Sequence, residues 1–179
     1  MILANQIQTQ LKKTLSVFKD LNRALAHFLA DMLSVMDRGV ILDLVQHVIK
    51  ELSPSTTEPQ LQLLDVKLEH IKILVLHEHW IALNLPRHHA LTVTNLPKLL
   101  DLYAQRHVLA GIVLRVVFEL SINHDKATRL KALAILHTLF MRHDHDARYN
   151  KRGVKQRIAE LYFPFVLHVR HTSCAIFSL

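Results

Sequence analysis

Residues 11–39 read LKKTLSVFKDLNRALAHFLADMLSVMDRG and hold a long, regular apolar pattern. Its apolar residues recur at steps of three and four: Leu11, Leu15, Phe18, Leu21, Leu25, Phe28, Met32 and Met36. This spacing lines one face of a helix, so it predicts a single long amphipathic helix. Asp37-Arg38-Gly39 then interrupts the pattern. Because glycine readily adopts the left-handed conformation that ends helices, we expect Gly39 to break the helix at this point.

The next two helices are expected on either side of a clear loop. The apolar pattern resumes as Val40, Ile41, Leu44, Val45, Val48, Ile49 and Leu52, which predicts a second helix folded back on the first. Proline and hydroxyl residues make 53–59 a loop. Thr57 and Gln60 resemble a capping box, so a third helix should start there. It is expected to fray near His79–Leu85, before Pro86; its apolar stripe is Leu61, Leu64, Leu68, Ile71 and Val75.

Three further helices are expected in the second half of the chain. Asn95, with Pro97 in the first turn, can cap a fourth helix that runs towards Leu120. Asp125 opens a fifth helix, whose expected apolar stripe is Leu130, Leu133, Leu136, Leu139 and Phe140. After a polar turn, a sixth helix should run from about Lys151 to His168, with a kink at Pro164 because proline removes a backbone donor.

The fold class that follows is all-α. Half of the residues are hydrophobic, and only 3 Gly and 5 Pro interrupt them, which favours long helices over the many turns of a β fold. Three consecutive helical hairpins predict an α-solenoid of the armadillo or HEAT type over residues 1–170, with 171–179 as an unassigned tail. No sequence signature repeats at a fixed period, so a compact irregular bundle remains an alternative.

The cellular setting expected from the sequence is the cytoplasm. Cys174 is the single cysteine and cannot form an internal disulfide, and no signal segment opens the chain. The apolar stretches are short of the ~20 residues that a membrane-spanning helix needs.

Fourteen histidines raise the question of a metal site. His77-Glu78-His79 has the wrong spacing, because helical residues two apart point about 200° apart and zinc pairs on helices are usually i and i+4. His88-His89 has the same defect unless a loop bends it. We therefore expect no metal, and a metal-dependent hydrolase is a distant alternative. A core or boundary position is expected for the histidines on or beside apolar stripes: His27, His47, His107 and His137.

The net charge of +7 is concentrated in residues 126–157, which hold nine Lys or Arg against Asp144 and Asp146. The predicted anion-facing surface consists of Arg142, Arg148, Lys151, Arg152, Lys155 and Arg157. Clustered cations attract the phosphates of nucleic acids and of anionic lipids. Tyr149 is the single aromatic residue between Phe140 and Tyr162, so the stacking platform expected of a single-strand nucleic-acid binder is missing. A basic helical repeat that binds nucleic acid or lipid is the alternative function, with contact to lipid or acidic protein favoured over nucleic acid. A merely solvated helix face is the simpler interpretation.

No catalytic site or cofactor is expected. The sequence lacks a glycine-rich phosphate loop and a Gly-x-Ser-x-Gly elbow. Cys174 could act as a nucleophile only with a base and an orienting group, and its tail position provides no such set.

Four stretches, in this order, resemble one family. They are LSVMDRG at 33–39, HEHWIALNLP at 77–86, DARY at 146–149 and RIAELYFPF at 157–165. They resemble the helical, armadillo-like region between the lipid-binding and exchange domains of the DOCK (dedicator of cytokinesis) family, in its zizimin-like branch. The resemblance covers roughly residues 14–169, with departures at Val40, Trp80 and Ala82.

The resemblance implies a role as a scaffold. In this family a separate exchange domain acts on Rho GTPases of the Rac or Cdc42 type, and a phosphoinositide-binding domain lies nearer the N-terminus. Neither is in these 179 residues, so the implied partners are the other domains of the parent protein, and the GTPase is reached only through the absent domain. Gly39, Pro86 and Pro164 are then structural positions, and membrane contact would be peripheral.

Self-association is also expected. A slice of solenoid exposes at its ends the apolar faces that further helices would cover. The apolar residues of the tail, 174–177, add to this surface, although a charge of +7 favours solubility.

Overall fold

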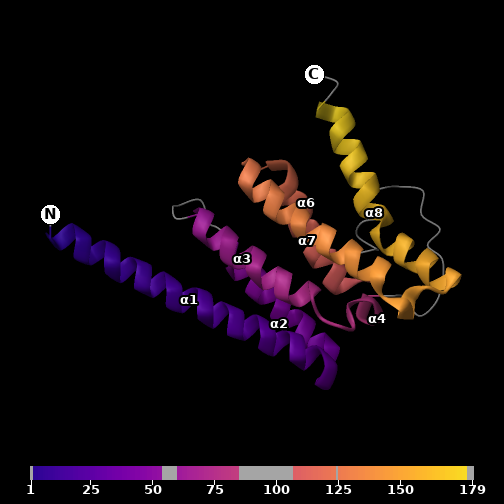
Figure 1. Ribbon diagram of the computed structural model, residues 1–179, viewed down its shortest axis with the longest axis horizontal. Coiled ribbons are helices and arrows are strands. Elements are labelled where there is room, and N and C mark those ends of the chain that lie inside the picture. Colours follow the sequence, from indigo (N-terminus) through magenta and orange to yellow (C-terminus); the bar gives the residue numbers. More distant parts are fainter. Residues whose placement is uncertain (1, 54–59, 85–106, 124, 177–179) are drawn as a thin grey trace. The chain divides into compact units, whose positions relative to one another are not determined.

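The computed structural model describes residues 2–53, 60–84, 107–123 and 125–176, and all the regular elements in these ranges are helices (Figure 1). The all-α prediction is confirmed. In the described part, none of the helices has the length and apolar character needed to cross a membrane. The chain divides into two compact units, residues 1–77 and 78–179.

The first unit consists of α1 (Ile2–Val35), α2 (Arg38–Glu51) and α3 (Gln60–Val75). α1 packs against both other helices, and its contact with α3 is the more extensive. In Figure 1 the N-terminal part of α1, drawn in indigo, extends beyond its two partners. The core of the unit contains Leu29, Leu33, Ile41, Val45, Ile71 and Leu74.

The helix itself is present, but the apolar stripe predicted for it is wrong: none of its members whose side chains the structure describes is buried. The residues of α1 that are buried against its partners are Asn22, Ala26, Leu29, Ala30 and Leu33. The predicted Phe18, Leu21, Leu25 and Phe28, with Met36 just beyond the helix, are exposed. Ala26 and Ala30 are buried beside Leu29 and Leu33, and a search for large apolar residues does not select the two alanines.

Asp37, rather than Gly39, makes the break between the first two helices. The Asp37 carboxylate accepts a hydrogen bond from the backbone N–H of Val40 at 3.2 Å, which makes Asp37 the N-cap of α2. Gly39 lies inside the first turn of α2, so its predicted role as a helix terminator is wrong. A Cβ at position 39 would lie 3.1 Å from Oδ1 of Asp37, so the glycine leaves room for the capping carboxylate.

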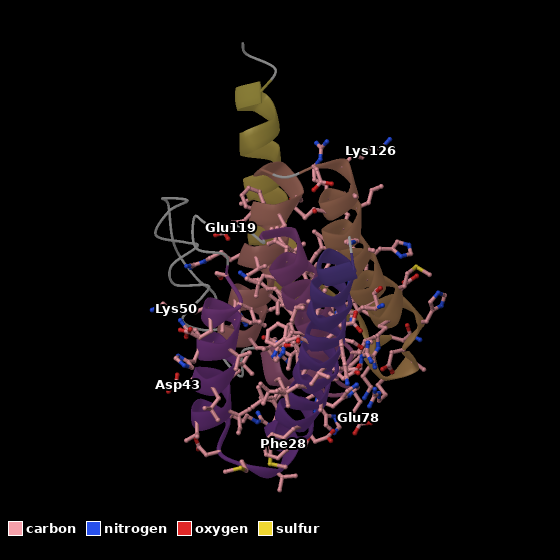
Figure 2. The ribbon with its side chains drawn as sticks, turned by 90° about the vertical axis from the view of Figure 1, so that its left-hand side faces the viewer. Phe28, Asp43, Lys50, Glu78, Glu119 and Lys126 are labelled. Carbon is pink, nitrogen blue, oxygen red and sulfur yellow. The ribbon has the colours of Figure 1, made fainter. Side chains whose placement is uncertain are left out.

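α2 is amphipathic around a narrow buried line. Ile41, Val45 and Ile49 follow one another at steps of four and are buried. Asp43 and Lys50 are exposed and point away from α1 and α3 (Figure 2). The predicted stripe is too wide, because Val40 and Leu44 are exposed; they lie one residue before Ile41 and Val45, about 100° around the helix.

α3 ends earlier than predicted. The N–H groups of Leu76 and His77 donate to Ile73 and Leu74, both at 3.2 Å, and these three-residue bonds tighten and close the last turn. A turn and the separate helix α4 (Trp80–Asn84) replace the expected fraying. The predicted capping box at Thr57, and the roles of Pro86, Asn95 and Pro97, lie outside the described residues.

The second unit is arranged around α6 (Val108–Asn123), which contacts α4, α7 (Lys126–His145) and α8 (Arg152–Ile176). A short 3₁₀ turn, η1 (Ala147–Tyr149), links α7 and α8. The buried residues of α6 recur at steps of three and four, as a central helix requires: Leu109, Ala110, Val113, Leu114, Val116, Val117 and Leu120.

α7 begins where the sequence predicts, but its buried face is different. Asp125 is its N-cap and accepts from the N–H groups of Ala127 and Thr128 at 2.9 and 3.3 Å. The predicted Leu136 and Leu139 are buried, whereas the predicted Leu130, Leu133 and Phe140 are exposed. The other buried residues of α7 are Thr128, Ala132 and Ile135. Thr128 and Ala132 are too small or polar to mark a core face by hydrophobicity alone.

α8 continues to Ile176, eight residues beyond the predicted end at His168. Residues 165–179 contain neither glycine nor proline, so the sequence offers no strong helix breaker there. The kink at Pro164 stays a prediction.

We predict that Asp37→Ala lowers the free energy of unfolding by about 1 kcal/mol, because the N–H of Val40 loses its capping acceptor. Urea denaturation followed by circular dichroism would measure this change. Asp37→Asn is the matched control and should stay close to the parent chain, since asparagine also caps helices. Equal losses in the two variants would contradict the capping role.

Candidate functional site

The stretches 77–86 and 157–165 meet through one buried hydrogen bond. Nε1 of Trp80, at the start of α4, donates to the hydroxyl oxygen of Tyr162, in the middle of α8, at 3.1 Å. Both side chains are buried. A buried indole N–H without a partner would be costly, so Tyr162 fixes the position at which α8 packs.

His143, in the last turn of α7, completes this cluster. Its Nε2 is hydrogen-bonded to the hydroxyl of Tyr162, and the two rings stack with centroids 5.5 Å apart. Since the tyrosine oxygen already accepts from Trp80, its own hydrogen can be donated to Nε2. Phe140 packs edge-on against Tyr162 at 5.1 Å. Four side chains from α4, α7 and α8 therefore form one aromatic cluster.

Burial sets the protonation of the cluster. Burial, together with the positive charge of Arg142, lowers the pKa of His143 to about 4, although the negative charge of Asp146 acts in the opposite direction. Burial also raises the pKa of Tyr162, while the bond from Trp80 lowers it. Both rings are neutral near pH 7, which suits a structural cluster in an apolar setting.

Asn84 joins α4 to the start of α6. Its Oδ1 accepts from the N–H of Ala110 at 2.8 Å, and its Nδ2 donates to the carbonyl of Trp80 at 2.8 Å. The N–H of Ala110 belongs to the first turn of α6, where backbone donors have no partner within the helix. Nδ1 of His107 is hydrogen-bonded to the carbonyl oxygen of Asn84. A residue from another helix thus caps α6.

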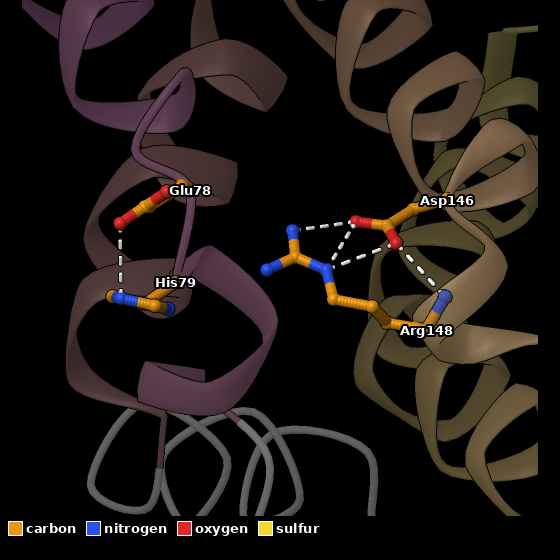
Figure 3. A network of polar contacts seen from close by, with 4 residues as sticks. All are labelled: Glu78, His79, Asp146 and Arg148. Atoms are coloured by element: carbon orange, nitrogen blue, oxygen red, sulfur yellow. Dashed lines mark hydrogen bonds and ion pairs between the residues drawn. The ribbon is translucent and has the colours of Figure 1, made fainter.

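The stretch 146–149 lies near residues 78–79 (Figure 3). The guanidinium of Arg148 binds both carboxylate oxygens of Asp146, with Nη2 at 2.7 Å from Oδ2 and Nε at 3.0 Å from each oxygen. These bonds hold the pKa of Asp146 below its usual range and raise that of Arg148, to which the charge of Glu78 contributes slightly. Glu78 itself pairs with His79 at 3.1 Å.

The six predicted anion-facing residues differ in their exposure and in their ion pairing. Arg142 and Arg157 are half-buried, and Arg148 is bound by Asp146. The other three, Lys151, Arg152 and Lys155, are exposed around the first turn of α8, which holds no acidic residue. They are grouped at this helix start, and Arg157 follows Lys155 by two residues, about 200° around the helix.

The described histidines that form hydrogen bonds do so at separate places in the two units, and they do not gather at one site. Nε2 of His77 lies 3.1 Å from the hydroxyl of Ser34. Among the described residues, no group of three or more His, Cys, Asp or Glu is arranged to hold a metal ion. His88-His89 lies outside the described residues, as does the side chain of Cys174.

Four histidines are expected in core or boundary positions, and the structure buries one of them. His107 is buried, as expected, whereas His27, His47 and His137 are exposed. Each of these three lies beside an apolar stripe but on the side of its helix that faces away from the partner helices. Periodicity alone cannot tell which border of a stripe is covered.

Sequence reasoning missed a buried polar pair in the first unit. Nδ1 of His70 lies 3.0 Å from Oδ1 of Asn22, and Nδ2 of Asn22 donates to the carbonyl of Val66 at 3.1 Å. Burial lowers the pKa of His70 to about 4. The signal that could have found it was position: His70 stands four residues after Val66 and four before Leu74, on the buried face of α3.

Comparison with known proteins identifies relatives of this chain. The family model described as "DOCK6-11, TPR domain" matches residues 1–75. Dedicator of cytokinesis protein 6 of Mus musculus is 31% identical over 93% of this chain, and dedicator of cytokinesis protein 7 of Homo sapiens is 29% identical over 92%. Guanine nucleotide exchange factor SPIKE 1 of Arabidopsis thaliana is 31% identical over 92%. The chain spans 10%, 9% and 8% of their lengths, respectively. No solved structure matches it.

We predict that the free energy of unfolding falls as the pH is lowered from 6.5 to 4. His143 and His70 have folded pKa values of about 4, below the value of 6.5 for an exposed histidine, so the unfolded chain binds more protons across this window. His143→Gln should reduce this slope, because glutamine bonds Tyr162 but does not titrate.

Urea denaturation at several pH values would measure the slopes. The matched control is His137→Gln, which changes an exposed histidine of the same helix and should retain the parent slope. Identical slopes for His143→Gln and the parent chain would contradict the assignment.

Proposed function

The chain belongs to the DOCK (dedicator of cytokinesis) family, and from this premise we propose that it is a helical scaffold segment of a guanine-nucleotide exchange factor. The factor would act on Rho GTPases of the Rac or Cdc42 type and belong to the zizimin-like branch. Residues 1–170 would form the scaffold, and 171–179 its tail. Exchange itself would be the task of a separate domain of the parent protein.

The observation that supports this proposal is that residues of the family-like stretches make contacts between helices and cap a helix. Trp80 from one stretch bonds Tyr162 from another, and Arg148 from a third lies close enough to Glu78 to sense its charge. Asp37, from the first stretch, caps a helix. These residues serve to hold helices together, which is the chemistry of a scaffold.

Its partners would then be the neighbouring domains of the parent protein, and the GTPase would be reached only through the exchange domain. The proposed setting is the cytoplasm, with recruitment to membranes by other parts of the parent. Such a segment needs no cofactor and no catalytic residue.

We predict that the purified chain does not accelerate nucleotide release from Rac or Cdc42. The release of a fluorescent GDP analogue would be followed with and without the chain at catalytic concentration. Release stimulated by a magnesium chelator is the positive control for the assay. A chain that sped release catalytically would overturn the scaffold proposal.

Contact with anionic lipid is the second candidate, and a specific observation favours it. Lys151, Arg152 and Lys155 are exposed around the first turn of α8, where the helix dipole is positive and no acidic residue compensates. A nearby anionic surface would relieve this accumulation of positive charge. Each basic residue near such a surface contributes about 1 kcal/mol.

We predict that the chain co-sediments with phosphatidylserine vesicles at low salt and is released at high salt. Changing Lys151, Arg152 and Lys155 to Glu should abolish sedimentation. The matched control changes three exposed basic residues of the first unit, Lys19, Arg38 and Lys50, to Glu and should bind nearly as well. Binding lost equally in both variants would indicate net charge rather than a surface on α8.

A further inference from the structure

α1 has a second apolar face, and it is exposed. We call this face the outer stripe; it consists of Val17, Leu21, Ala24, Phe28 and Val35. These residues follow one another at steps of four, three, four and seven. This spacing keeps them on one line along the helix, as in a coiled-coil seam. The line lies on the side opposite the residues buried against α2 and α3, and Phe18 and Leu25 flank it.

The outer stripe is large for a surface with no function. Its bulky members and the two flanking residues keep between 37% and 77% of their area exposed. That amounts to roughly 600 Å² of apolar surface, comparable to the largest patch on a typical monomer, and such patches mark interaction sites. Two copies that covered this area together would bury about 1,200 Å², the lower end of what specific interfaces bury.

Side-chain sizes along the outer stripe suit an antiparallel partner with the same sequence. If two copies of α1 cross antiparallel about a point between Asn22 and Arg23, Val17 lies opposite Phe28 of the other copy. Leu21 then lies opposite Ala24. Each bulky side chain faces a smaller one, which is how facing helices interdigitate.

Charge complementarity supports the same arrangement. Lys13 and Asp31 are both exposed and stand 18 residues apart, which is five helical turns, so they border the outer stripe on the same side. In the antiparallel pair, Lys13 comes within one residue of the level of Asp31 of the other copy, twice by symmetry. In a parallel pair the two charges would remain about 27 Å apart along the axis and could not meet.

We infer that the partner of the outer stripe is a second copy of this chain, packed antiparallel along α1. The inference goes beyond the proposed scaffold role and does not depend on it. The interface would be isologous, with each copy offering the same stripe and the same two charges.

Sedimentation of the full chain over a range of concentrations tests association. We expect a reversible monomer–dimer equilibrium. Leu21→Glu should raise the dissociation constant by about tenfold or more, since it would bury a charge in the seam. Leu133→Glu, at an exposed leucine of α7, is the matched control and should leave the equilibrium unchanged. Circular dichroism should show that both variants keep the parent fold.

The orientation has its own tests. Lys13→Asp should weaken the dimer several-fold by placing like charges together, and the double change Lys13→Asp with Asp31→Lys should restore it. In a Cys174→Ser background, mixing Val17→Cys with Phe28→Cys chains should give a 17–28 disulfide. Neither variant should cross-link to itself, because identical residues would be about 16 Å apart along the axis.

Four results would overturn the inference. They are a chain that stays monomeric at high concentration, a dimer that Leu21→Glu does not weaken, a Val17→Cys chain that cross-links to itself, and charge variants that behave alike. A monomer whose outer stripe instead inserts into lipid vesicles would also exclude the second copy as the occupant.

Discussion

The second unit depends on the hydroxyl of Tyr162. One oxygen, buried among aromatic rings, accepts from Trp80 of α4 and contacts His143 of α7, while its own ring belongs to α8. Each of these groups loses its water on burial and regains a partner only if the three helices meet correctly. The cluster therefore fixes how α4, α7 and α8 pack together. Apolar contacts alone would allow these helices to shift along one another.

The first unit also has a buried hydrogen bond between side chains of two helices, here between an amide and an imidazole. Asn22 and His70 bond each other across α1 and α3, and Nε2 of His70 is left without a partner. A satisfied bond and an unsatisfied atom in one side chain mean that this contact contributes more to specificity than to stability. The pairing selects a register between α1 and α3, because shifting either helix would leave both amide and imidazole buried and unpaired.

The sequence predicts the helical class and several of the helix boundaries, because these depend on local chemistry. The cap at Asp125 needs only its own carboxylate and the next few N–H groups, so it could be identified directly. The face of each helix that is buried could not be identified from local sequence. Phe28 is larger than Ala26, yet Ala26 is buried and Phe28 is exposed. That selection is made by the partner helix.

The candidate site likewise has features that the sequence predicts and features that depend on the fold. The six basic residues were visible as a cluster in sequence, but the engagement of Arg148 by Asp146 depends on how η1 folds, which composition does not reveal. Likewise, Trp80 and Tyr162 are 82 residues apart, so only the fold brings them together.

The capping of α6 by Asn84 makes two helices a single cooperative element. α4 is a five-residue helix, far too short to be stable by itself, and α6 lacks a capping group of its own for the N–H of Ala110. Neither can open alone without leaving backbone groups unpaired, so their local unfolding is coupled. The first turn of α6 therefore depends on a side chain that stands 26 residues earlier in the chain.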